Sequence, residues 1–78
     1  MQKIIDGYLY DTDTATLLYT DNSSYPRKVE YYMTPKHNYF AVYFNGEFQV
    51  VEEQFIKDIL GKYDIAKYIE LFGEPQEG

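Results

Sequence analysis

The stretch Tyr39-Phe-Ala-Val-Tyr-Phe-Asn-Gly-Glu-Phe-Gln-Val-Val-Glu-Glu53 decides how this chain folds. Asn45-Gly46 lies between two runs of aromatic and β-branched residues, a pattern that strongly favours a β-hairpin. The apolar alternation ends at Glu52 and Glu53, where acidic side chains suit the positive end of a helix dipole. The stretch therefore predicts a hairpin that leads directly into a helix.

The register of this hairpin follows from the distribution of apolar residues. A plain two-residue turn at Asn45-Gly46 would mix polar and apolar side chains on both faces of the hairpin. A three-residue loop with a left-handed Gly46 instead pairs Val42 with Phe48 and places the polar and apolar side chains on opposite faces. We therefore predict the bulged turn. In this register one face carries Val29, Tyr31, Met33, Phe40, Val42, Phe48 and Val50, and the other carries Tyr32, Tyr39, Tyr43, Glu47 and Gln49.

The rest of the chain completes a single α+β domain spanning residues 1–78. Outside the hairpin, β-prone segments cover residues 3–5, 8–10, 16–20 and 28–34, with turns at Asp6-Gly7 and at residues 11–15. Two short helices follow, the first ending at Gly61 and the second capped by Asp64. Their apolar stripes consist of Phe55, Ile56, Ile59 and Leu60, then Ile65, Tyr68, Ile69 and Phe72. We expect an antiparallel meander of four to five strands with both helices packed on one face.

Composition excludes several classes of protein. The 78 residues include no cysteine, which excludes a disulfide scaffold and thiolate metal sites and favours a reducing cytoplasm. Thirteen acidic residues against seven basic ones give a net charge of −6, which argues against binding to nucleic acid. No apolar run has the length of a membrane span, so we expect a protein without membrane contact.

Residues suited to catalysis or metal binding are scarce. His37 is the only histidine, and it falls in a predicted turn. Asp6, Asp11 and Asp13 form a weak candidate for a cation site, but turn and capping roles explain them better. We therefore expect no enzymatic activity, no metal and no cofactor.

Two sets of residues are candidates for binding a partner protein. The first is a tyrosine face, because tyrosine is enriched at the centres of protein interfaces; the alternative is that another element or a second copy of the chain covers it. The second is an acidic group, which the helix dipole and solubility could also explain. The tyrosine face consists of Tyr32, Tyr39 and Tyr43, and the acidic group of Glu47, Glu52, Glu53 and Asp58.

Three segments resemble a group of small proteins carried by phages and mobile elements of Gram-positive bacteria. They are Ile-Ile-Asp-Gly at 4–7, Tyr-Asp-Thr-Asp-Thr-Ala at 10–15, and Tyr-Ile-Glu-Leu-Phe-Gly-Glu-Pro at 68–75. The resemblance implies a stoichiometric inhibitor of host defence, most plausibly an anti-CRISPR protein acting in the host cytoplasm. CRISPR effectors hold nucleic acid in positively charged channels, which an acidic surface could occupy.

Two other functions remain open from the sequence. The chain could be a structural or regulatory domain that self-associates through the tyrosine face, as a homodimer rather than a monomer. It could also sequester a nucleotide signal, which would require a pocket with converging polar groups.

Overall fold

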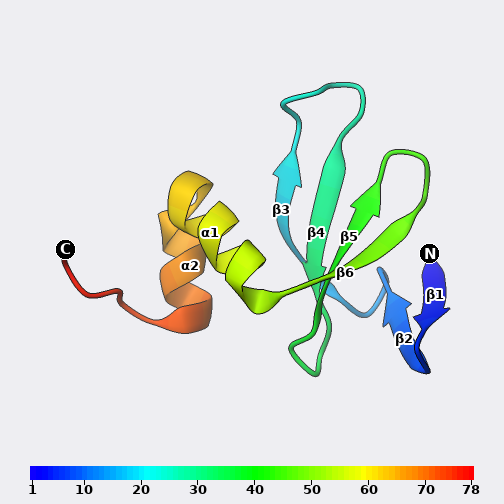
Figure 1. Ribbon diagram of the computed structural model, residues 1–78, viewed down its shortest axis with the longest axis horizontal. Helices are drawn as coiled ribbons and strands as arrows, with labels where there is room; N and C mark the ends of the chain where they lie inside the picture. The colour runs from blue at the N-terminus through cyan, green and yellow to red at the C-terminus, as the bar shows by residue number, and fades with distance from the viewer.

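The computed structural model describes residues 1–78 and confirms the predicted α+β class. A two-stranded sheet, a four-stranded antiparallel sheet and two C-terminal helices form three layers, seen from right to left in Figure 1. The strand order is β1-β2 in the small sheet and β3-β4-β5-β6 in the large one. The elements are β1 (Gln2–Ile5), β2 (Tyr8–Asp11), β3 (Thr16–Asp21), β4 (Val29–Met33), β5 (Tyr39–Tyr43), β6 (Phe48–Val51), α1 (Glu53–Tyr63) and α2 (Ile65–Phe72).

The large sheet is the predicted antiparallel meander, here of four strands, and the N-terminal hairpin forms a separate two-stranded sheet beside it. Asp6 and Gly7 have φ values of 51° and 80°, the left-handed conformation that a two-residue hairpin turn requires at both positions. Antiparallel pairing then sets Ile4 opposite Leu9 and Ile5 opposite Tyr8. The dipeptide predicted as a turn therefore reverses the chain instead of merely interrupting one strand.

A tight turn links this hairpin to the main sheet, as the polar residues at 11–15 predict. The Asp11 carboxylate accepts a hydrogen bond from the Asp13 amide at 2.9 Å, and the Asp11 carbonyl accepts one from the Ala15 amide at 3.0 Å. Short polar side chains of this kind stabilise turns by bonding nearby backbone amides.

The bulged turn between β5 and β6 is confirmed. Gly46 has a φ of 85°, its amide donates to the Tyr43 carbonyl at 2.9 Å, and Val42 pairs with Phe48. The Tyr43 amide also donates to the Glu47 carbonyl at 2.8 Å, which closes the three-residue loop. The turn chemistry at Asn45-Gly46 therefore sets the register between β5 and β6.

The predicted position of β4 against β5 is wrong by one residue. Tyr31 pairs with Ala41 and Tyr32 pairs with Phe40, so Tyr32 lies on the Phe40 face and Tyr31 lies on the opposite one. Because Tyr39, Phe40, Ala41 and Val42 are all buried, β5 has no polar face that could fix this register. The residues that share the face of Phe40 are Glu30, Tyr32, Val42, Phe48 and Val50, and those on the other face are Val29, Tyr31, Met33, Tyr39, Ala41, Tyr43 and Gln49.

Both faces of the large sheet are covered. The N-terminal hairpin lies on one face, where Tyr10 meets Phe40 edge-on at 5.4 Å between ring centroids. The helices lie on the other face, where Ile56 and Leu60 are buried against Tyr39 and Ala41. The sheet is therefore the middle layer of the molecule, and both helices cover one face as predicted.

The two helices differ from the prediction at Gly61 and at Ile65. Gly61 does not end α1, which continues to Tyr63, whereas the predicted cap Asp64 accepts a hydrogen bond from the Lys67 amide at 3.1 Å. A Cβ atom on Gly61 would lie 3.9 Å from the Tyr68 ring, so this glycine sits at the contact between α1 and α2. Ile65 is exposed, although the predicted stripe includes it.

Neither helix combines the length and the apolar content needed to cross a membrane.

Candidate functional site

The three predicted tyrosines do not form one surface. Tyr32 stacks on Phe40 at 5.2 Å on the face that the N-terminal hairpin covers. Tyr39 is only 4% exposed and lies on the opposite face, 6.5 Å from the Phe72 ring. The prediction of a shared tyrosine face is therefore wrong, because it rested on the incorrect register of β4 and because the helices cover Tyr39.

Burial raises the pKa of two of these tyrosines. It raises the pKa of the Tyr39 hydroxyl above its ordinary range, and the nearby Glu53 carboxylate raises that pKa further. Burial likewise raises the pKa of Tyr32, with a smaller contribution from the Glu30 carboxylate. Both side chains act as structural parts of the core.

Tyr43 borders a groove at the junction of β6 and α1. The groove has a volume of about 370 Å³. The Tyr43 hydroxyl donates a hydrogen bond to Gln49 Oε1, which joins β5 to β6 at this wall. We call this feature the β6–α1 groove, and the residues that line it are Tyr43, Gln49, Val50, Val51, Glu52 and Phe55.

The aromatic and apolar residues of the β6–α1 groove come from three elements, with Tyr43 in β5, Val50 and Val51 in β6, and Phe55 in α1. Phe55 lies in the first turn of α1, where its ring is 45% exposed and tilts against Tyr31 at 5.7 Å. Val51 ends β6 directly before the helix begins. β6 is also the edge strand of the sheet, so one side of its backbone lacks a neighbouring strand.

The acidic group is distributed around this groove and along α1. Glu52 lines the groove and is its only charged residue. Glu53 forms an ion pair with Lys57 at 3.4 Å, and Asp58 accepts a hydrogen bond from Gln54 Nε2 at 2.9 Å. Glu47 is exposed in the loop that connects β5 to β6. The structure therefore brings Tyr43 and Glu52 into one site and leaves Asp58 farther along the helix.

The chemistry of the β6–α1 groove suits a cationic side chain. The aliphatic stem of a lysine or arginine can lie on an apolar surface such as Phe55 while its charged end reaches a carboxylate. Aromatic rings also attract cations through their electron-rich faces. The groove offers these features without a competing lysine or arginine in its lining.

Phe55 is the groove residue that the sequence analysis assigned to the core. Ile56 and Leu60 are the members of its helical stripe that become fully buried, while Phe55 falls at the edge of the stripe. Four large apolar residues on an 11-residue helix fall within the usual width of a core-facing stripe, so the sequence pattern does not single out Phe55 as exposed.

The other candidate residues have local structural roles. The Asp11 carboxylate accepts hydrogen bonds from Gln2 Nε2 at 3.0 Å and from the Asp13 amide, and these two bonds lower the pKa of Asp11. His37 has a φ of 64° in the exposed turn between β4 and β5. No three acidic or histidine side chains gather where they could hold a metal ion.

Comparison of the chain with protein-family models, curated proteins and solved structures finds no match.

Proposed function

We propose that this chain is a non-catalytic binding protein that engages a basic surface of a partner protein through the β6–α1 groove. The observation that carries the proposal is the pairing of exposed Phe55 with Glu52 in a groove that contains no basic residue. This combination accepts the stem and the charge of one lysine or arginine side chain.

The charge of the whole molecule supports the same kind of partner. Its net charge of −6 attracts a basic surface over long distances and repels nucleic acid. The exposed acids Glu47 and Glu53 lie on the loop and the helix that adjoin the groove. Electrostatic steering would therefore bring a basic partner toward this side of the molecule.

The more specific proposal is an inhibitor of host defence that acts as an anti-CRISPR protein. It rests on the resemblance of residues 4–7, 10–15 and 68–75 to small phage proteins, together with the acidic surface. A CRISPR effector presents arginines and lysines in the channels that hold nucleic acid. A bound acidic protein would block that channel stoichiometrically.

The test measures DNA binding and cleavage by a panel of purified CRISPR effectors in the presence of excess protein. We expect one effector to lose both activities at equimolar protein, and we expect Glu52→Gln with Phe55→Ala to restore them. The matched control is Glu77→Gln with Tyr63→Ala, which removes the same charge and an exposed ring at the opposite end of α1 from the groove. Unchanged activity across the panel would remove the anti-CRISPR proposal.

One observation favours self-association as a second function. Ile4 and Leu9 are cross-strand partners on the outer face of the N-terminal hairpin, and they are 71% and 55% exposed. Light scattering coupled to size-exclusion chromatography tests this alternative. A dimer that Leu9→Lys converts to a monomer would support it, and a wild-type monomer at all concentrations would contradict it.

A further inference from the structure

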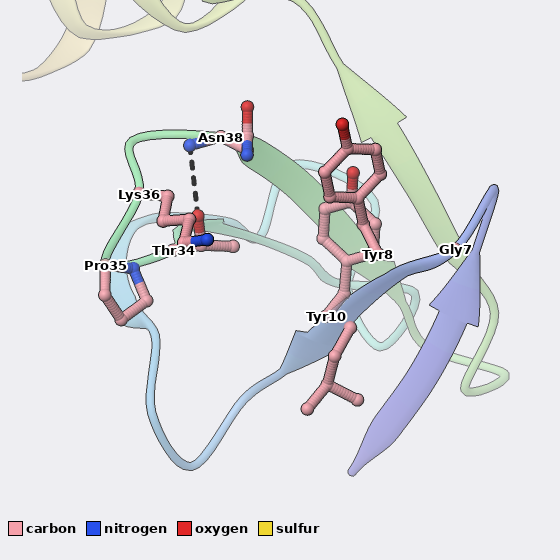
Figure 2. Close-up of a pocket in the computed structure, with 8 residues that line it drawn as sticks. Gly7, Tyr8, Tyr10, Thr34, Pro35, Lys36 and Asn38 are labelled. Atoms are coloured by element: carbon pink, nitrogen blue, oxygen red, sulfur yellow. Dashed lines mark hydrogen bonds between the residues drawn. The ribbon is translucent and has the colours of Figure 1, made fainter.

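A second cavity lies on the opposite side of the sheet from the helices. It has a volume of about 350 Å³ and is formed by β2 and the turn between β4 and β5. Figure 2 shows the rings of Tyr8 and Tyr10 on one side of this cavity and the turn on the other. We call it the hairpin pocket, and its lining consists of Gly7, Tyr8, Leu9, Tyr10, Thr34, Pro35, Lys36 and Asn38.

The walls of the hairpin pocket are held by contacts within the core and the turn. Tyr10 is 5% exposed and packs on the buried Phe40, which fixes β2 against the sheet. The Thr34 amide donates to the Asn38 carbonyl at 2.8 Å, and the Asn38 amide donates to Thr34 Oγ1 at 3.0 Å (Figure 2). The pocket is thus largely formed before any ligand binds, which is typical of small-molecule sites.

The hairpin pocket contains one cationic group and several side chains that can donate hydrogen bonds. The Lys36 ammonium is the only charge in the lining, and it takes part in neither of the two ion pairs of the molecule. Thr34 is a buried residue with 7% of its surface exposed; its hydroxyl accepts the Asn38 amide proton, and no protein atom accepts the hydroxyl's own proton. A lysine, a buried hydroxyl with a free proton and the Asn38 side-chain amide together favour an anionic ligand.

The aromatic wall adds a second requirement for the ligand. Tyr8 is 60% exposed, although its neighbour Tyr10 on the same face of β2 is buried. An open tyrosine ring across the cavity from a cationic group (Figure 2) can stack against a planar aromatic ligand. The volume of the pocket falls in the lower part of the range typical of small-molecule sites, roughly 300–1,000 Å³.

We propose that the hairpin pocket binds a small anion that carries a planar aromatic ring, of the nucleoside monophosphate class. The base stacks on Tyr8, and the phosphate is held by the Lys36 ammonium with the Thr34 hydroxyl as a donor. The site lies on the hairpin face of the sheet, whereas the β6–α1 groove lies beside the helices, so this proposal stands independently of the proposed function.

The test is isothermal titration calorimetry of the full chain with adenosine monophosphate, adenosine and inorganic phosphate as separate probes. We expect the nucleotide to bind more tightly than either fragment, because only it uses both the ring and the ammonium. Tyr8→Ala and Lys36→Gln should each weaken nucleotide binding by about tenfold or more. Phe44→Ala and Lys62→Gln are the matched controls, since they alter an exposed ring and an exposed lysine outside the pocket.

Three results would overturn this proposal. They are the absence of nucleotide binding at millimolar concentration, nucleotide binding that neither pocket variant weakens, and inorganic phosphate binding as tightly as the nucleotide. Lys36 is exposed in a turn, so Lys36→Gln reports on the site even if Tyr8→Ala disturbs the hairpin.

Discussion

Replacement of Phe40 by alanine tests whether the N-terminal hairpin is an integral layer of the fold. Phe40 has no exposed surface, and its ring lies 5.2 Å from Tyr32, 5.5 Å from Phe48 and 5.4 Å from Tyr10. Truncation of a buried phenylalanine typically costs about 3–5 kcal/mol, partly through the cavity that it leaves. The whole 78-residue domain is expected to have a free energy of unfolding of roughly 4–12 kcal/mol, so this single change removes a large share.

The assay is urea denaturation followed by circular dichroism, with Phe44→Ala as the control. Phe44 is 59% exposed and lies under the Arg27 guanidinium at 5.6 Å, so its loss should cost less than about 1 kcal/mol. Hydrogen exchange should also show faster exchange of the β1 and β2 amides in Phe40→Ala than in the control. Equal stabilities of the two variants would refute the packing of the hairpin on the sheet.

Three further predictions concern capping and ionisation. Asp64→Ala removes the cap of α2 and should lower the free energy of unfolding by about 1 kcal/mol in urea denaturation. Gln2→Ala removes a hydrogen bond to Asp11, so the pKa of that carboxyl, measured by NMR titration, should rise toward its ordinary value. Asp11 stabilises the fold above its unfolded pKa, and this contribution is lost as the pH falls through the lower folded-state pKa. Glu53→Gln should lower the pKa of Tyr39 without restoring its ordinary value, because burial is the larger cause. The raised pKa of Tyr39 means that stability is full below the ordinary tyrosine pKa and declines as the pH rises through the folded value.

Local signals in the sequence predicted the turns and the hairpin register well. At Gly46 the turn chemistry and the separation of polar from apolar residues point to the same register, and the structure has it. Asp64 likewise combines a strong capping residue with the start of a new apolar stripe. Both predictions succeed because each depends on residues that are close in the chain.

The prediction failed where the register depends on packing rather than on local chemistry. Alternation of polar and apolar residues fixes the pairing of two strands only when one face of each strand is polar. Because β5 is buried on both faces, alternation could not fix its pairing with β4. The sequence gives no sign that the N-terminal hairpin folds back over Phe40. The tyrosine face inferred from that register therefore divides between two layers.

The candidate sites were predicted only in part, because they depend on tertiary packing rather than on local sequence signals. Glu52 and Tyr43 were identified from their residue types, and the structure places both in the β6–α1 groove. The hairpin pocket combines Tyr8 with the turn from Thr34 to Asn38, which only the tertiary fold brings together. Sequence periodicity carries no information about such a juxtaposition.

The most direct test of the proposed function is NMR mapping of an isotope-labelled chain titrated with a lysine- and arginine-rich peptide. We expect the largest shifts at the amides of Tyr43, Gln49, Val51 and Phe55, and we expect high salt and Glu52→Gln to reduce them. A matched peptide with glutamine at the basic positions should produce no such shifts. Shifts spread evenly over the molecule, or an equal response to the glutamine peptide, would contradict the assignment of the β6–α1 groove to a basic partner.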